Sequence, residues 1–203
     1  LTEKFNIIQS AMASAERIFL LLDQEESIKN IESPVCLGKV QGKIEFKNVW
    51  FAYQGENWVL RDVSFTINPG ETVAFVGATG AGKTSIISLI TRMYDIQKGE
   101  ILIDGKNIKD IDKYELRSQI AVVLQDVFLF TGDIKGNIRL NNEYITDDKI
   151  EEVAGFVNAD TFIRKLPKKY DEKVMERGAT LSSGQRQLLA FARALAFNPS
   201  VLV

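Results

Sequence analysis

The sequence contains no histidine and only one cysteine, Cys36. Histidine is the commonest metal ligand and acid–base side chain, so its absence removes the usual basis for such sites. A single cysteine excludes an internal disulfide and a cysteine-built zinc site, and it is compatible with a reducing compartment. The net charge of the 203 residues is -2, so no overall basic field would attract nucleic acid or an anionic membrane surface.

Long apolar runs are also missing. No stretch reaches the ~18 consecutive apolar residues of a membrane-spanning helix, and no secretory leader is visible. The chain starts with Leu1 rather than methionine, from which we expect it to begin inside a longer polypeptide. Hydrophobic residues make up 45% and charged residues 26%, values that are typical of a globular protein able to bury a core.

The first 24 residues are expected to form a helix, because apolar side chains recur every three or four positions. The apolar positions are Leu1, Phe5, Ile8, Met12, Ala15, Phe19 and Leu22. The pattern is compatible with a helix that packs on one partner surface and equally with the end of a longer helix from another domain. Residues 25–42 contain Ser33, Pro34, Gly38 and Gly42 and are expected to be a linker.

From residue 43 onward, strand and helix patterns alternate, as in an α/β domain. Alternating or continuous apolar runs predict strands at residues 44–47, 63–67, 72–76, 100–103, 120–124 and 200–203, of which 72–76 and 120–124 should be buried on both faces. Helical spacing predicts helices at residues 85–94, 114–118, 146–162 and 183–197. Turn residues occupy 68–70 and 104–105.

The most specific motif is rich in glycine and matches the pattern G-x-x-x-x-G-K-[ST]. Its residues are Gly77, Ala78, Thr79, Gly80, Ala81, Gly82, Lys83 and Thr84. The motif follows a predicted strand and precedes a predicted helix, so backbone N–H groups and a helix N-terminus can bind a phosphate. Lys83 should reach the β- and γ-phosphates, Thr84 should bind Mg²⁺, and Ser85 should lie near the α-phosphate. The alternative is a glycine-rich turn without a ligand.

A second motif precedes the predicted helix at 183–197 and consists of Leu181, Ser182, Ser183, Gly184 and Gln185. Ser182 or Ser183 can cap that helix. The motif resembles the signature of ATP-binding cassette (ABC) proteins, usually Leu-Ser-Gly-Gly-Gln, from which Ser183 departs. The resemblance implies that this helix end faces the γ-phosphate of an ATP held by a second nucleotide-binding domain.

The resemblance covers about residues 40–203 and implies an α/β fold of a particular kind. This fold is a P-loop NTPase core with an antiparallel β subdomain and a helical subdomain at about residues 126–198, preceded by the N-terminal helix. The ATP-binding domain itself would span residues 43–203. Residues 133–140 would belong to the part of the helical subdomain that meets membrane helices.

Three further positions match the family in order. Tyr53 stands where an aromatic ring stacks on adenine, and Val59 is assigned to the same ATP site. Gln125 resembles the glutamine that contacts Mg²⁺ and the attacking water. Glu176 resembles the acidic loop of exporters, although Met175 stands where glycine is more usual. Tyr53 and Gln125 also have ordinary interpretations, as a core aromatic and a strand-terminal polar residue.

The resemblance implies an exporter ATPase that uses ATP and Mg²⁺. Lys83 and Gln125 would be catalytic, and Thr84 and Gln125 would contact the metal. The partners would be a second nucleotide-binding domain and a transmembrane domain of the same polypeptide, at the cytoplasmic face of the cell membrane. Residues 1–24 would then be the tail of the last membrane helix. No nucleic acid is implied.

The aspartate–glutamate pair that the family needs would follow the strand at 200–203, beyond the sequence given. We therefore expect the 203-residue chain to bind nucleotide without hydrolysing it, and to expose apolar sheet edges. Alternatives are a regulatory half of a heterodimer, motivated by Ser183, a soluble cassette ATPase acting on DNA or ribosomes, and an unrelated P-loop kinase. The apolar N-terminal helix and the lack of a basic net charge argue against the soluble cassette ATPase. The signature motif argues against the P-loop kinase.

Overall fold

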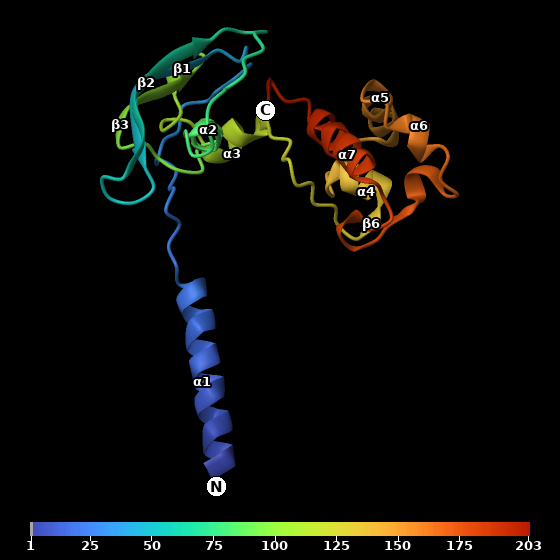
Figure 1. Cartoon of the computed structure of the whole chain (residues 1–203), viewed down its shortest axis with the longest axis horizontal. Helices are drawn as coiled ribbons and strands as arrows, with labels where there is room; N and C mark the ends of the chain where they lie inside the picture. The colour runs from blue at the N-terminus through green and yellow to red at the C-terminus, as the bar shows by residue number, and fades with distance from the viewer. Residues whose placement is uncertain (1) are drawn as a thin grey trace.

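The computed structural model describes residues 2–203, with the side chains from residue 4 onward. Two lobes lie side by side, and a long helix extends away from them (Figure 1). The elements in chain order are α1 (Thr2–Leu22), β1 (Ile44–Ala52), β2 (Trp58–Ile67), α2 (Lys83–Ile90), β3 (Lys98–Ile103), β4 (Lys106–Asn107), α3 (Lys113–Ser118), β5 (Ile120–Ala121), β6 (Gly132–Asp133), α4 (Ile134–Arg139), α5 (Asp147–Phe156), α6 (Asp160–Ile163), η1 (Lys169–Asp171), β7 (Lys173–Val174), η2 (Glu176–Gly178), α7 (Ser183–Ala196) and β8 (Val201–Leu202).

Helix α1 confirms the predicted N-terminal helix, although Leu1 lies outside the described residues. The large apolar side chains of its predicted seam, from Phe5 to Leu22, are all exposed. No helix among the described residues is long and apolar enough to cross a membrane. That this apolar face packs on a partner surface or belongs to a transmembrane domain therefore stays a prediction.

The first lobe is built on an antiparallel sheet with the order β2-β1-β3-β4. The predicted alternation is confirmed in β1, where Ile44 and Phe46 are buried while Lys47 is exposed. The predicted turn at Asp104 and Gly105 joins β3 to β4, and both residues have positive φ angles, of 48° and 79°. The apolar face of this sheet packs with α2 and α3 in one core.

A bulge in β1 brings the backbones of two neighbouring strands very close together. Asn48 has a φ of 47°, and the register with β3 shifts between Lys47 and Trp50. Gly99 lies opposite with a φ of 87°, and a Cβ atom there would be 2.3 Å from the Asn48 carbonyl oxygen. Only glycine fits at this point.

The segment between α1 and β1 is tied closely to this lobe. Arg92, only 3% exposed, donates a hydrogen bond of 3.2 Å to the Lys29 carbonyl oxygen. The buried Lys113 ammonium donates to the Ile28 carbonyl oxygen at 3.0 Å, and Leu37 joins the core. The predicted linker is thus irregular in conformation and is also anchored by buried cations.

The predicted buried strand at residues 72–76 is wrong for this structure. These residues form no strand, and Val76 is 93% exposed. A hollow of about 780 Å³ lies between this segment, α2 and β8. A strand needs hydrogen-bonded neighbours along its edges, and none of the strands that the structure describes pairs with residues 72–76. Among the strands that the structure describes, β5 pairs in parallel with β8, and an isolated parallel bridge joins Val35 to Ile111. Strand β5 ends at Ala121 rather than at residue 124.

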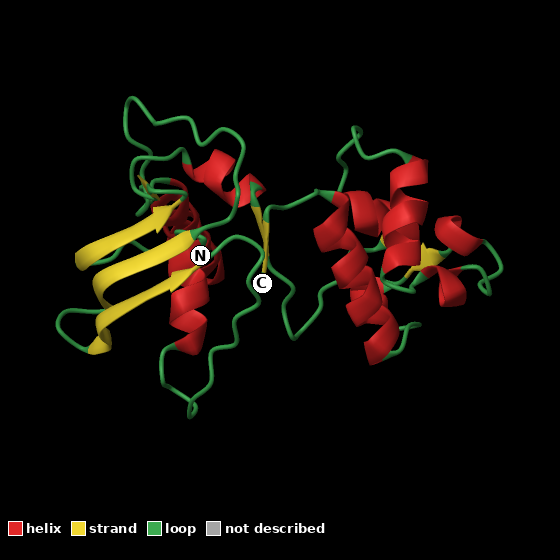
Figure 2. Ribbon diagram, turned by 90° about the horizontal axis from the view of Figure 1, so that it is seen from above, coloured by secondary structure: helices red, strands yellow, loops and turns green. Residues whose placement is uncertain are grey.

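The second lobe is helical and lies on the other side of the C-terminal strand (Figure 2). Its core forms around α7, which contacts α4 and α5. The helix predicted at residues 146–162 is interrupted, because Asn158 takes a φ of 60° between α5 and α6. Helix α2 similarly ends at Ile90, before the predicted residue 94, and Arg92 takes a φ of 48°.

We predict that Gly99→Ala destabilises the sheet lobe by about 2 kcal/mol or more, because the new methyl group meets backbone atoms that cannot yield. Chemical denaturation followed by tryptophan fluorescence measures this, since Trp50 and Trp58 lie in the same sheet. Gly155→Ala in α5 is the matched control, because its Cβ would meet nothing within 4 Å. That change should be neutral or stabilising by up to about 1 kcal/mol. Equal effects of the two substitutions would contradict the prediction.

Candidate functional site

The glycine-rich motif forms an open loop that ends at the start of α2. Gly80 and Gly82 have φ angles of 86° and 85°, which other residues adopt at a cost. Gly82 is the N-cap of α2 and supplies no side-chain cap. A Cβ atom at Gly82 would lie 2.7 Å from the terminal Cδ2 atom of Leu60, so a larger residue here would also require the Leu60 side chain to shift.

The start of α2 offers unused hydrogen-bond donors. The N–H groups of the first helical turn have no acceptor within the helix, and here no side chain caps them. Lys83 folds back over the loop, where its Nζ atom donates to the carbonyl oxygens of Gly77 and Ala78 at 2.9 and 2.8 Å. The loop thus presents an ammonium group and free N–H groups to the same space, which suits a phosphate.

A hollow of about 350 Å³ lies over this loop. It is lined by Tyr53, Val59, Thr79, Gly80, Gly82, Lys83, Thr84 and Ser85. Every lining residue is among those predicted from the sequence for nucleotide binding. Gly77 and Ala81 belong to the loop but do not line the hollow. The structure therefore joins the end of β1, the start of β2 and the phosphate loop in one place.

Tyr53 lies just beyond the end of β1 and is 48% exposed. Its ring packs edge-on against Phe51 and Tyr94, with centroid distances of 4.8 and 5.0 Å. Its hydroxyl group lies 2.9 Å from the hydroxyl of the buried Ser85. Phe51 and Tyr94 were not predicted as site residues, because an aromatic residue in a strand or at a helix end has no pattern that separates it from ordinary core residues.

Gln125 lies apart from this hollow. It is exposed in the extended segment between the two lobes, and it does not line the space beside Thr84. The joint contact of Thr84 and Gln125 with Mg²⁺ therefore stays a prediction.

The signature motif lies in the helical lobe, at the beginning of α7. Ser182 is the N-cap, and its Oγ atom accepts a hydrogen bond from the Gln185 N–H at 3.2 Å. Gln185 returns the contact, since its Oε1 atom accepts from the Ser182 N–H at 2.9 Å. Leu181 is buried, whereas Ser183 and Gly184 are exposed. The departure at Ser183 thus leaves the capping box intact and the helix end open to solvent.

Glu176 begins a short helical turn, η2, ahead of the signature motif. Arg177 and Gly178 both have positive φ angles, of 54° and 68°. A Cβ atom at Gly178 would lie 2.8 Å from the Leu129 side chain. The acidic side chain is therefore exposed on a turn whose shape depends on a glycine.

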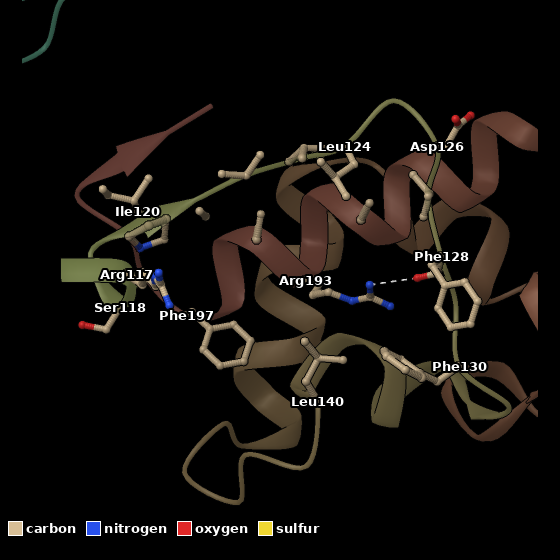
Figure 3. Close-up of a pocket in the computed structure, with 17 residues that line it drawn as sticks. Arg117, Ser118, Ile120, Leu124, Asp126, Phe128, Phe130, Leu140, Arg193 and Phe197 are labelled. Carbon is tan, nitrogen blue, oxygen red and sulfur yellow. Dashed lines mark hydrogen bonds between the residues drawn. The ribbon is translucent and has the colours of Figure 1, made fainter. Parts of the chain in front are cut away.

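Another hollow, of about 330 Å³, lies between the segment that contains Gln125 and helix α7 (Figure 3). Its apolar rim includes the exposed Phe128 and Phe130. Arg193 of α7 crosses this space, donates to the Phe128 carbonyl oxygen at 3.0 Å and lies beside the Phe130 ring. Burial lowers the pKa of the Arg193 guanidinium. The segment after Gln125 is therefore tied to the signature helix.

A sequence model of the ABC transporter family matches residues 60–203. This chain belongs to the ABC transporter family. A solved bacterial Atm1-family ABC exporter with ATP bound matches the structure with a TM-score of 0.86 and 33% sequence identity, over 98% of this chain and 35% of that chain. The expected resemblance and the expected fold class, a P-loop NTPase core with β and helical parts after an N-terminal helix, are confirmed.

Several curated ABC proteins are similar in sequence. A Streptococcus pneumoniae protein named as the ABC transporter ATP-binding protein exp8 is 45% identical over 202 residues, which cover 100% of this chain and 34% of that protein. The ATP-dependent lipid A-core flippase of Syntrophus aciditrophicus is 41% identical, over 100% of this chain and 34% of the flippase. The fatty acid ABC transporter ATP-binding/permease protein of Mycobacterium bovis is 42% identical, over 98% of this chain and 31% of the transporter. This ABC chain thus spans about a third of the length of the curated relatives it matches.

We predict that Ser182→Ala loosens the first turn of α7. Loss of the N-cap should cost about 1 kcal/mol, which corresponds to about five-fold faster amide hydrogen exchange at Gln185 and Arg186. Ser183→Ala is the matched control, because it leaves both capping hydrogen bonds in place. Identical exchange rates in the two variants would show that the capping box does not order this helix end.

Proposed function

We propose that this chain binds ATP with Mg²⁺ and forms the nucleotide-binding part of an ABC exporter. The observation that carries the proposal is the meeting of Tyr53, Lys83 and the free N–H groups of α2 around one hollow. An aromatic ring suits a base, and an ammonium group beside a helix N-terminus suits phosphates. The hollow is thus lined both by an aromatic ring that suits the base and by donors that suit the phosphates of one nucleotide.

The proposed roles follow from position. The N–H groups of the loop and of the first turn of α2 hold the phosphate oxygens, and Lys83 exchanges its carbonyl contacts for the β- and γ-phosphates. Thr84 is the second residue of α2, and its hydroxyl contacts Mg²⁺. Gln125 contacts the same metal ion. The metal neutralises phosphate charge. Tyr53 and Val59 support the adenine.

The second half of the proposed site comes from another nucleotide-binding domain. In this chain the residues 181–185 lie in the lobe opposite the phosphate loop, at an exposed helix end. Such an end attracts the γ-phosphate of an ATP bound elsewhere. We infer that two domains face each other and that each signature motif completes the partner's site.

The proposed transport role concerns the longer polypeptide. Helix α1 presents an exposed apolar face, as expected for the tail of a transmembrane domain, and the lobes would lie at the cytoplasmic face of the membrane. The relatives named above carry different substrates in their names, lipid A-core and fatty acids. We therefore propose export as the transport role and assign no transported substrate.

We predict that Lys83→Ala weakens Mg²⁺–ATP binding by at least about ten-fold, because a charge-assisted contact to phosphate contributes about 1.5–3 kcal/mol. Displacement of a fluorescent ATP analogue from the 203-residue chain measures this affinity. Lys39→Ala is the control, since Lys39 is exposed and lies outside the loop. Unchanged affinity in Lys83→Ala would contradict the assigned role of the loop.

We predict that residues 1–203 bind ATP without steady-state turnover. Among the residues that the structure describes, those lining the hollow over the phosphate loop include no carboxylate that could polarise a water molecule. A phosphate-release assay at high protein concentration tests this. Mg²⁺-dependent turnover that disappears in Lys83→Ala would refute it.

A further inference from the structure

The edge of β1 next to Tyr53 is completed by a side chain. The last residue pair between β1 and β3 joins Trp50 to Lys98. Beyond this pair the Gln97 amide takes the place of a strand. Its Oε1 atom accepts from the Ala52 N–H at 3.0 Å, and its Nε2 atom donates to the Ala52 carbonyl oxygen at 2.8 Å.

Ala52 is consequently held from both sides. On the other edge it pairs with Trp58 of β2. Because Ala52 directly precedes Tyr53, the two hydrogen bonds of Gln97 limit where the Tyr53 backbone can go. Gln97 does not line the hollow over the phosphate loop and so acts on it only through Tyr53.

The ring of Tyr53 is held by a second group, from the region just after α2. Tyr94 meets it edge-on, with an interplanar angle of 88°, and also contacts Phe51 at 5.7 Å. Ser85, within α2, meets the Tyr53 hydroxyl. Helix α2 therefore begins at the phosphate loop, and Ser85 within it and Tyr94 just after it both contact Tyr53.

We propose that Gln97 and Tyr94 are positioning residues that orient Tyr53 for the nucleotide base. This inference rests on the proposed ATP binding. It adds that the part of the site that contacts the base is built by residues outside the glycine-rich loop. Loss of either residue should weaken binding of a base-bearing ligand and spare a ligand that has phosphates alone. A residue with only a structural role would affect both ligands alike.

The experiment compares ATP with inorganic tripolyphosphate, each with Mg²⁺, as displacers of a fluorescent ATP analogue from the 203-residue chain. Gln97→Ala should weaken ATP about five-fold, the effect of about one lost net hydrogen bond, and leave tripolyphosphate unchanged. Gln97→Glu, of equal length, should do the same, because its second oxygen repels the Ala52 carbonyl group. Gln41→Ala, at an exposed position, is the matched control.

Tyr94 is tested in the same assay. Tyr94→Leu should weaken ATP selectively, whereas Tyr94→Phe keeps the ring and should match the wild type. Equal losses for both ligands, or unchanged ATP affinity in both Gln97 variants, would overturn the inference while leaving ATP binding intact. If the wild type binds neither ligand, the proposed function fails, and the inference fails with it.

Discussion

Helix α2 begins with no side chain capping its first N–H groups, and several contacts of the sheet lobe converge on this helix. The N-cap is Gly82, which supplies no side chain to satisfy those groups and whose φ of 85° disfavours any larger residue. The hydroxyl of Ser85, in the first turn of the helix, lies 2.9 Å from the Tyr53 hydroxyl. Beyond its other end, the buried Arg92 binds the segment that leads from α1. One helix therefore links the proposed phosphate site, the Tyr53 ring and the segment that follows α1.

The two lobes divide the chemistry between them. Lys83 and Tyr53 belong to the sheet lobe, while Ser182 and Gln185 cap a helix in the other lobe. The segment with Gln125 runs between the lobes, and Arg193 ties its continuation at Phe128 to the signature helix. Gln125 is not among the residues that line the hollow over the phosphate loop. A change in the relative position of the lobes would therefore move Gln125 with respect to Thr84.

The segment at residues 72–76 shows where local pattern and structure separate. Its apolar run is that of a buried strand, yet Val76 is almost fully exposed and a large hollow lies beside the segment. Apolar composition favours a buried strand, but strand formation also requires backbone partners on adjacent chains of the sheet. Helices need no such partners, because their hydrogen bonds are internal to the segment. This explains why α7 and α3 lie where periodicity placed them.

Local signals in the sequence were sufficient for the phosphate loop, the capped signature helix, most strands of the antiparallel sheet and the family to which the chain belongs. These features depend on residues close together in the chain, such as the glycines around Lys83 or the reciprocal contact of Ser182 and Gln185. The family resemblance had already assigned Tyr53 and Val59 to the same site as the loop, whereas only the tertiary structure decided that Gln97 completes the edge of β1 and that Gln125 stays apart. Those contacts join distant segments, and their geometry depends on strand register, bulges such as that at Gly99, and the relative placement of two lobes, none of which local spacing encodes.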